Sequence, residues 1–519
     1  MTEISQTRNT NWFVKLLKAI GHGVVGIFKS IGAFFVNLGK RIAAFFTGLW
    51  QIMRHGNWIT RTSFVVMGFG CFAYGQWLRG MLYLVLQVGF ILFMIFSGGN
   101  ALVKFTDLGN VVQIPTYDEV TGAQSGFTKG DNSLVILLFG VVTILIILIV
   151  VAMYFKQLRN AFHNQEMREL GLPIDGTKQD LRQMLNKNFH TTILALPTLG
   201  IAIFTVIPLI FMLLIAFTNY DKAHPGVGTP DNPGLWDWVG LDNFISLFNF
   251  TGTTSMGMTF IRLLGWTLLW AVLSTVTTYI GGMILALLIN KKGVRCKKVF
   301  RAFFVVTIAV PQFVSLLVIS KFLDTNGGLV NTLISKWGLI SPEFADKLMD
   351  MGIMNSSHKI MWFGNAHLAR TMVIIVNMWV GVPYSMLITS GILMNIPEEL
   401  YESARIDGAG PVKTFFKITL PYMLFVTGPH LITQFIGNIN NFNVIFLLTN
   451  GGPTSPDLTA PAGKTDLLIT WLYNLTVNGD YKNYKMGTVI GILIFIVCAF
   501  VSLIVYSRTS AVKNEEVFQ

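Results

Sequence analysis

Charged side chains are scarce in this chain of 519 residues, because Asp, Glu, Lys and Arg together account for only 12% of it. In an average soluble domain the same four residues account for about 25%. Hydrophobic residues make up 52% of the sequence. A composition this poor in charge excludes an ordinary soluble globular protein and indicates an integral membrane protein.

The residues that build catalytic or metal sites are missing as well. Acidic side chains are almost absent from the long apolar runs, so a buried carboxylate pair or a proton relay has nothing to be built from. The eight histidines have no HExxH or other metal-ligand spacing, and no serine stands in a G-x-S-x-G elbow. Cys71, Cys296 and Cys498 fit no ligand or disulfide spacing. We expect no catalytic residue, no metal and no cofactor.

One short motif points the other way. Gly463, Lys464 and Thr465 look like the end of a phosphate-binding P-loop. That motif needs a glycine five positions earlier, so that the backbone can wrap the phosphates, and here Leu458 takes its place. The triplet also falls in a loop predicted to be external, away from cytoplasmic ATP. We therefore expect no nucleotide site in this chain.

Eight apolar runs are long enough to cross a membrane, since a spanning helix needs roughly 20 mostly apolar residues. Basic residues gather before the first run, from Lys156 to Lys187, and from Lys291 to Arg301. The positive-inside rule makes these segments cytoplasmic and predicts that the N- and C-termini are cytoplasmic too. The net charge of +12 then reflects orientation and contact with anionic lipid, rather than nucleic-acid binding. The predicted spans are Met81–Ser97, Leu134–Tyr154, Thr191–Phe217, Ile261–Ile289, Ala302–Phe322, Thr371–Met394, Met423–Thr449 and Met486–Tyr506.

An 11-residue repeat precedes the first span, with copies that begin at Lys18, Lys29 and Lys40. A period of 11 is about 3.67 residues per turn, which keeps equivalent positions aligned along one helix. The repeat predicts a basic amphipathic helix in the cytoplasmic interface of the membrane. The alternative is that this helix packs on the cytoplasmic side of the protein itself.

The stretch "YESARIDGAGPVKTFFKITLP", from Tyr401 to Pro421, interrupts the apolar runs on the predicted cytoplasmic side. Pro397 and the acids after it suit the first turn of a helix. That helix is predicted to end near Gly408, and Pro411 to begin a second short one. Two helices with an exposed apolar side can bind a partner protein through that side. An ordinary amphipathic linker has similar features.

This stretch resembles the EAA loop of ABC importer membrane subunits, whose pattern is E-A-A-x3-G-x9-I-x-L-P. One position departs, where a serine replaces the middle alanine. The resemblance implies a coupling helix that sits in a cleft of a cytoplasmic ATPase, with the glutamate meeting a basic residue there and the glycine making the turn. The matching residues are Glu402, Ser403, Ala404, Gly408, Ile418, Leu420 and Pro421.

Four further stretches are similar to the MalF-type membrane subunit of maltose and maltodextrin importers: "VGLDNFISLF", "NMWVGVPYSMLI", "NNFNVIFLLTNGGP" and "TAPAGKTDLLITWLYNLT". The resemblance implies three partners: a second, MalG-like permease subunit, a homodimeric cytoplasmic ATPase and an extracellular sugar-binding protein. One feature departs. Enterobacterial members carry a large folded domain where this chain has a short loop, about Thr218 to Ile261, which indicates a single-membrane bacterium with a lipid-anchored binding protein.

Two polar trios lie inside predicted spans, each on one helical face because the spacing is i, i+4 and i+7. They are Asn377, Gly381 and Tyr384, and Gln434, Asn438 and Asn441. Neutral amide and hydroxyl groups suit a sugar, but Asn and Gln also join spanning helices to each other. In maltose permeases the resemblance implies sugar contacts at Asn377, Val380, Gly381, Tyr384, Gln434, Gly437, Asn438 and Asn441. At two of these positions the chain differs from the maltose permeases: Gln434 replaces a serine, and Gly437 replaces a phenylalanine that stacks on the sugar. These differences make the assignment of maltose as substrate weaker than that of an oligosaccharide in general.

We therefore expect an all-α, polytopic membrane protein with about eight spans and the fold of a type I ABC importer permease. Residues 1–80 are the basic amphipathic region, 81–160 two additional spans, 190–510 the six-helix transmembrane domain and 397–421 the EAA loop. The predicted function is import of malto-oligosaccharides across the cell membrane. The alternatives are import of galacto-oligosaccharides or another plant oligosaccharide, and a channel-like or structural membrane protein outside the ABC class.

Overall fold

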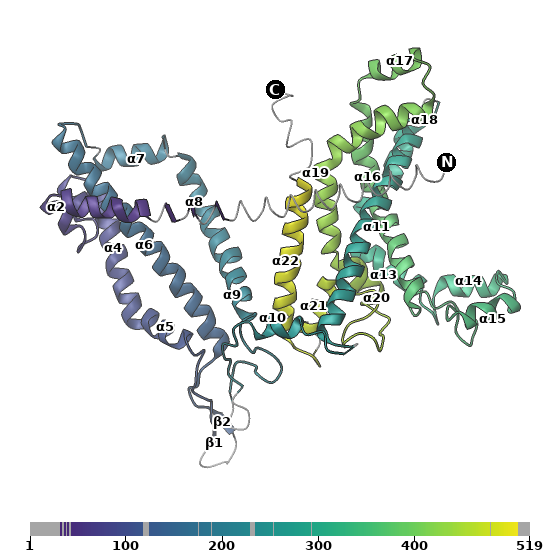
Figure 1. Cartoon of the computed structure of the whole chain (residues 1–519), viewed down its shortest axis with the longest axis horizontal. Helices are drawn as coiled ribbons and strands as arrows, with labels where there is room; N and C mark the ends of the chain where they lie inside the picture. The colour runs from purple at the N-terminus through teal and green to yellow at the C-terminus, as the bar shows by residue number, and fades with distance from the viewer. Residues whose placement is uncertain are drawn as a thin grey trace, which may run out of the picture. The chain divides into compact units, whose positions relative to one another are not determined.

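In this computed structural model the chain divides into two compact units, Met1–Val239 and Gly240–Gln519. The structure describes residues 32–33, 36–37, 39–40, 43–117, 124–174, 176–187, 189–228, 234–252, 254–291, 293–477 and 479–506. Figure 1 shows the helices of both units. The first copy of the 11-residue repeat and most of the second lie outside these residues. In the third copy residues 43–55 are helical, and Phe45 contacts the ring of Phe155 edge-on at 4.4 Å.

The first unit is built on three apolar helical segments. Trp77–Phe105, Ser133–Glu169 and Thr192–Ile215 are each long and apolar enough to cross a membrane, which confirms the first three predicted spans. A small antiparallel hairpin between them pairs Pro115 with Phe127. The elements of this unit are α2 (Trp58–Thr62), α3 (Phe69–Ala73), α4 (Trp77–Phe93), η1 (Met94–Gly98), α5 (Gly99–Phe105), β1 (Pro115–Tyr117), β2 (Gln124–Phe127), α6 (Ser133–Glu169), α7 (Thr177–Leu185), α8 (Phe189–Ile201), η2 (Ala202–Val206) and α9 (Ile207–Ile215).

Buried hydrogen bonds fasten the segment around α2 to the second half of α6. Gln165 accepts from the hydroxyl of Thr60 at 2.8 Å and from the backbone N–H of Asn57 at 2.9 Å. About two turns earlier on that helix, Gln157 donates to the carbonyl of Ser63 at 2.8 Å. Polar side chains buried in this way are stable only when they are paired. The segment just before the first span is therefore part of the folded unit.

The second unit is centred on two long helices, α11 (Met256–Asn290) and α16 (Ala366–Met394). Small residues bring them close together: a Cβ on Gly282 would lie 2.4 Å from the Cβ of Ser385, and one on Gly381 2.6 Å from Thr278. Such contacts are typical of helices that pack inside a membrane. The other elements are α10 (Asp242–Leu247), α12 (Lys297–Ala309), α13 (Gln312–Phe322), α14 (Leu329–Trp337), α15 (Pro342–Asp350), α17 (Glu398–Ile406), α18 (Pro411–Thr414), η3 (Phe415–Thr419), α19 (Leu420–Ile439), α20 (Phe442–Thr449), α21 (Leu468–Val477) and α22 (Tyr484–Tyr506).

The fifth predicted span, Ala302–Phe322, is not one continuous helix. It is broken into α12 and α13, which meet at an angle of 89°. Val310 between them is extended, with φ −75° and ψ 126°. Pro311 explains the break, because it has no N–H to donate and disfavours helical geometry at the residue before it. Among the described residues the number of spans is seven, or eight if the bent pair crosses as one.

The seventh predicted span, Met423–Thr449, also has an interruption. It lies within a segment, Pro411–Thr449, that is long and apolar enough to cross, but α19 ends at Ile439 and α20 begins at Phe442. Asn441 caps α20, its side chain accepting from the N–H of Val444 at 3.4 Å. Asn side chains compete with helical backbone hydrogen bonds and so favour caps. The prediction that Asn441 continues the helical face of Gln434 and Asn438 is therefore wrong.

The segment from residue 323 to 365 folds into a small structure of its own. Ala345, Met354 and Ile360 form its buried apolar centre. The side chain of Asn331 donates to the carbonyl of Ile360 at 2.9 Å and so joins α14 to the following loop. This long loop is therefore folded on a small apolar core.

Candidate functional site

The 397–421 loop contains the predicted pair of short helices. Its first helix, α17, ends in a complete Schellman motif: the N–H of Ala409 donates to Ala404 at 2.8 Å, and that of Gly408 to Arg405 at 3.0 Å. Gly408 has φ +70°, a left-handed conformation that suits glycine at this position. Pro411 then occupies the first position of α18. The turn was predictable because glycine and proline occupy the positions where a helix stops and the next one starts.

The two faces of α17 have different surroundings. Ala404 is buried, and the hydroxyls of Tyr401 and Thr419 share a hydrogen bond of 3.1 Å that holds the helix against η3. Glu402 and Ser403 are exposed on the other side. Figure 1 shows α17 at the tip of the second unit, beyond the ends of α16 and α19.

Apolar side chains near α17 are left in the open. Ile406 is 86% exposed, and Val412 and Phe416 are also largely exposed. Of the other motif residues, Ile418 and Leu420 are half-buried and Pro421 is exposed. Contiguous exposed apolar side chains rimmed by charge mark a surface that binds another protein. The arrangement can therefore receive a partner at the end of the spans.

The structure brings three of the predicted sugar-site residues together from α16, α19 and the start of α20. The amide of Asn441 donates to Asn377 at 3.4 Å and lies 3.5 Å from the side-chain oxygen of Asn438. Asn438 in turn donates to the hydroxyl of Thr275 at 3.0 Å. Asn377 and Asn438 are each only 8% exposed. The result is a small cluster of uncharged hydrogen-bonding groups inside the unit.

The remaining predicted residues divide between packing and open positions. Gly381 lies against Thr278, and Val380 packs on the apolar core of the unit. Gly437 is exposed, with open space where a Cβ would be, and Tyr384 is 53% exposed. Open positions next to a cluster of amides can receive a polar, uncharged ligand with flat apolar faces.

Gln434 is half-buried, and its side-chain oxygen accepts no hydrogen bond from the described residues. Buried polar atoms normally have a partner. The side-chain oxygen of Gln434 is therefore a buried acceptor without a partner among the described residues.

Two neighbours of this cluster were not predicted from the sequence. Thr275 hydrogen-bonds Asn438, and the ring of His430 lies 6.1 Å from that of Tyr384. His430 is one helical turn before Gln434, so the same spacing argument could have found it. Thr275 lies in a helix rich in threonine and serine, where no pattern distinguishes it.

The 450–467 loop lies at the other end of the second unit and is tied down by its own charges. Lys464 contacts Asp457 at 2.7 Å, and this hydrogen bond, with one from Ser455, holds the pKa of the Asp457 carboxyl at about 2. Asp466 is fully buried, and burial raises its pKa to about 6. The same loop contains Gly463, Lys464 and Thr465, which here bend back on Gly451 and Gly452.

Comparisons with known proteins agree with one another. Residues 278–510 match the protein family described as "Binding-protein-dependent transport system inner membrane component". The galactooligosaccharides transport system permease protein GanP of Bacillus subtilis is 30% identical over 457 residues, 87% of this chain and 97% of that protein. The maltodextrin permease MdxF of the same organism is 31% identical over 454 residues, 87% and 96% of the two chains.

Two further matches cover a smaller share of this chain. The maltose/maltodextrin permease MalF of Escherichia coli is 34% identical over 274 residues, 53% of this chain and 49% of that protein. A solved bacterial ABC transporter that imports the acidic polysaccharide alginate aligns with a TM-score of 0.46 and 23% identity. That alignment covers 64% of this chain and 98% of the other.

Proposed function

The chain belongs to the family of inner membrane components of binding-protein-dependent transport systems, and from this premise we propose that it imports malto-oligosaccharides across the cytoplasmic membrane. It is a multi-pass membrane component of an ABC importer. The observation that carries the substrate class is the similarity to a maltodextrin permease at 31% identity over 87% of this chain. Because the chain belongs to this family, the alternative of a channel-like or structural protein outside the ABC class no longer applies.

In this proposal the energy comes from a separate cytoplasmic ATPase, which binds the 397–421 loop. The exposed apolar residues around α17 supply the contact surface, and Glu402 supplies a charge for a basic residue of the ATPase. Closure of the ATPase dimer would push α17 and tilt the attached spans, a rigid-body change coupled at an interface. Both termini are then cytoplasmic, and the 450–467 loop faces outward.

The assembly has further proposed members. Residues 190–510 form the transmembrane domain, and it pairs with a second, MalG-like permease subunit. An extracellular sugar-binding lipoprotein delivers the oligosaccharide to the outer end of the spans, and residues 81–160 add two further helices. These assignments rest on family membership and on the positions of the predicted spans.

The sugar would bind at the cluster of Asn377, Asn438 and Asn441 and at the open positions beside it. Neutral amides fit a neutral oligosaccharide, because each can donate to and accept from hydroxyl groups. Asn377→Ala and Asn441→Ala are expected to raise the KM for maltotriose uptake about tenfold, the cost of one lost hydrogen bond of roughly 1.4 kcal/mol. Asn440→Ala is the matched control, because Asn440 is an exposed neighbour outside the cluster. An unchanged KM in both cluster variants would remove these residues from the site.

Galacto-oligosaccharides are the second candidate substrate. GanP matches over the same share of this chain as MdxF, and the open space at Gly437 leaves room for another sugar shape. Direct uptake of each member of a panel of labelled oligosaccharides, with the purified binding protein present, separates the two. Strong uptake of galacto-oligosaccharide without uptake of maltodextrin would overturn the maltodextrin assignment.

A further inference from the structure

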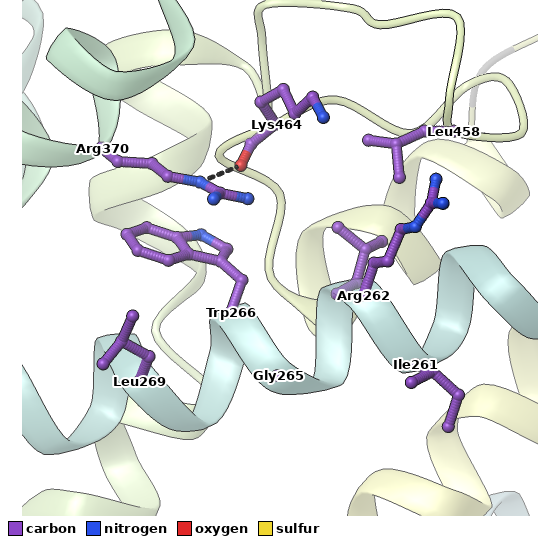
Figure 2. Close-up of a pocket in the computed structure, with 9 residues that line it drawn as sticks. Ile261, Arg262, Gly265, Trp266, Leu269, Arg370, Leu458 and Lys464 are labelled. Atoms are coloured by element: carbon purple, nitrogen blue, oxygen red, sulfur yellow. Dashed lines mark hydrogen bonds between the residues drawn. The ribbon is translucent and has the colours of Figure 1, made fainter.

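A pocket of about 330 Å³ lies far from the 397–421 loop, between α11, the first turns of α16 and the 450–467 loop. Figure 2 shows α11 as its floor, with the side chains of Arg370 and Trp266 on one side and those of Arg262 and Leu458 on the other. The backbone of Lys464 closes it from above. Neither the proposed sugar path nor the ATPase contact uses this pocket.

Positive charge dominates the pocket. Asp457 pairs with two of its three cations, at 2.7 Å from Lys464 and 3.2 Å from Arg262. The third, Arg370, donates from Nε to the carbonyl of Lys464 at 2.8 Å and lies 4.4 Å above the ring of Trp266. The low pKa of Asp457 keeps that carboxylate charged at neutral pH. Three cations around one carboxylate leave a surplus of two positive charges, which favours an anionic ligand.

The floor of the pocket continues into an apolar stripe. Ile261, Gly265 and Leu269 follow one another at helical spacing along α11, and the two large side chains are 46% and 51% exposed. Gly265 leaves a hollow between them, because nothing lies within 4 Å of where its Cβ would be. Farther along the same helix Val272 and Val276 are also exposed. The ligand that suits this surface is charged at one end and apolar at the other.

The pocket lies at the depth of lipid headgroups. Helix α11 has 35 residues, so it is about 52 Å long at 1.5 Å per residue, against about 30 Å for the hydrocarbon core. Roughly 20 residues counted back from Asn290, where α11 ends, reach Ala271. Trp266, about 7 Å farther out, then lies in the headgroup layer, where Trp is favoured. Arg262 lies one turn beyond it, with a side chain long enough to reach back toward that layer, and the stripe beyond Leu269 enters the hydrocarbon.

We propose that this pocket binds the phosphate of an anionic phospholipid, whose glycerol and acyl chains follow the exposed stripe of α11. Arginine suits a phosphate because its guanidinium donates two parallel hydrogen bonds. A zwitterionic lipid has the same phosphate but adds a cationic ammonium group, which the surplus positive charge repels.

The test measures lipid retention by the purified full-length chain in native mass spectrometry, with phosphatidylglycerol or phosphatidylcholine of equal acyl length. Phosphatidylglycerol should be retained about tenfold more strongly, because the surplus positive charge of the pocket repels the choline group of phosphatidylcholine. The double variant Arg262→Gln and Lys464→Gln should lose this preference. The double variant Lys336→Gln and Lys347→Gln, at exposed lysines on α14 and α15, is the charge-matched control and should keep it. Equal retention of both lipids by the unaltered chain would overturn the proposal.

A second variant keeps every charge and blocks the stripe instead. Gly265→Phe should also lower phosphatidylglycerol retention, whereas Gly200→Phe on α8, another glycine with open space around it, should not. Two outcomes name other ligands and overturn the lipid assignment. One is displacement of the lipid by excess inorganic phosphate, which marks a site for the free ion. The other is loss of uptake by the charge variants with lipid preference intact, which marks a contact with an acidic protein.

Discussion

Two loops at opposite ends of the second unit differ in how far the chain itself completes them. The 450–467 loop is closed by its own neighbours: Thr465 and Asp466 are fully buried, and the indole of Trp266 donates to the carbonyl of Thr465 at 3.1 Å. The 397–421 loop leaves Ile406 and Val412 more than two-thirds exposed. Exposed apolar side chains of this kind are suited to being covered by a partner. The 397–421 loop therefore leaves apolar surface open, whereas the 450–467 loop packs against its own chain.

The largest expected effect tests the unfinished loop. Glu402→Arg should reduce ATP-driven uptake by about 30-fold or more, because reversing a charge at a protein contact costs roughly 2–5 kcal/mol. Uptake in membrane vesicles is the measurement, with membrane abundance from an immunoblot. Glu343→Arg on α15 applies the same change to an exposed acid at the other end of the unit and should leave uptake intact. Equal uptake by both variants would remove the distinction between the two loops.

The next effect compares two glycines with left-handed backbone. Gly451 has φ +83° and Gly408 φ +70°, so alanine strains either position by about 1–2 kcal/mol. At Gly451 the new Cβ would also lie 2.2 Å from a carboxylate oxygen of Asp466, whereas at Gly408 it meets open space. Gly451→Ala should therefore lower the thermal midpoint clearly more than Gly408→Ala, measured by tryptophan fluorescence in detergent. A larger loss at Gly408 would contradict the closed state of the 450–467 loop.

A smaller effect comes from one hydroxyl in each loop. Thr465 donates to the carbonyl of Gly452 at 2.6 Å and shares a 2.7 Å contact with Thr449. Its replacement by valine leaves buried acceptors unpaired and should cost about 1–2 kcal/mol. Tyr401→Phe removes a single hydroxyl contact, the one of 3.1 Å with Thr419 in the other loop, and should cost less. The measurement is the thermal unfolding midpoint of the two variants. A larger loss of stability in Tyr401→Phe than in Thr465→Val would contradict the difference between the two loops.

The last expected effect is a pH dependence in the 450–467 loop. Burial raises the pKa of Asp466 from 3.8 to about 6, so the folded chain binds this proton more tightly than the unfolded chain. The free energy of unfolding should therefore fall as pH rises from about 4 to 6 and stay level above that range. Asp466→Asn should flatten this decline, while Asp346→Asn, an exposed acid on α15, should not. Unfolding midpoints between pH 4 and 8 measure it.

The sequence predicted regular helices well, because apolar runs of about 20 residues have few alternatives in a membrane. The turn at Gly408 was predictable for a similar reason, since its chemistry is local. The break at Pro311 was also encoded locally, but a count of apolar residues ignores it. At Asn441 the same spacing argument failed, because a side chain that can cap a helix competes with one that continues it.

The pocket at Arg262, Arg370 and Lys464 could not be read from the sequence at all. Its three cations are separated by 108 and 94 positions, as their numbering shows, and only packing of α11 against α16 and the 450–467 loop brings them together. The joining of Asn377 with Asn441 was foreseen only through family resemblance. Contacts between distant segments depend on how the helices pack, which no periodicity specifies.

The right-angled break between α12 and α13 forms a hinge between these two helices. Below the joint, Lys297 donates to the carbonyl of Asn290 at 3.0 Å, so α12 follows the end of α11. Above it, Ser320 donates to the carbonyl of Leu448 at 3.2 Å, so α13 stays with α20. Pro311 has no N–H, so flexing here breaks no hydrogen bond of its own. Helix α12 can therefore move with the 397–421 loop while α13 stays in place. A movement at one end of the bent pair need not disturb the contacts at the other end.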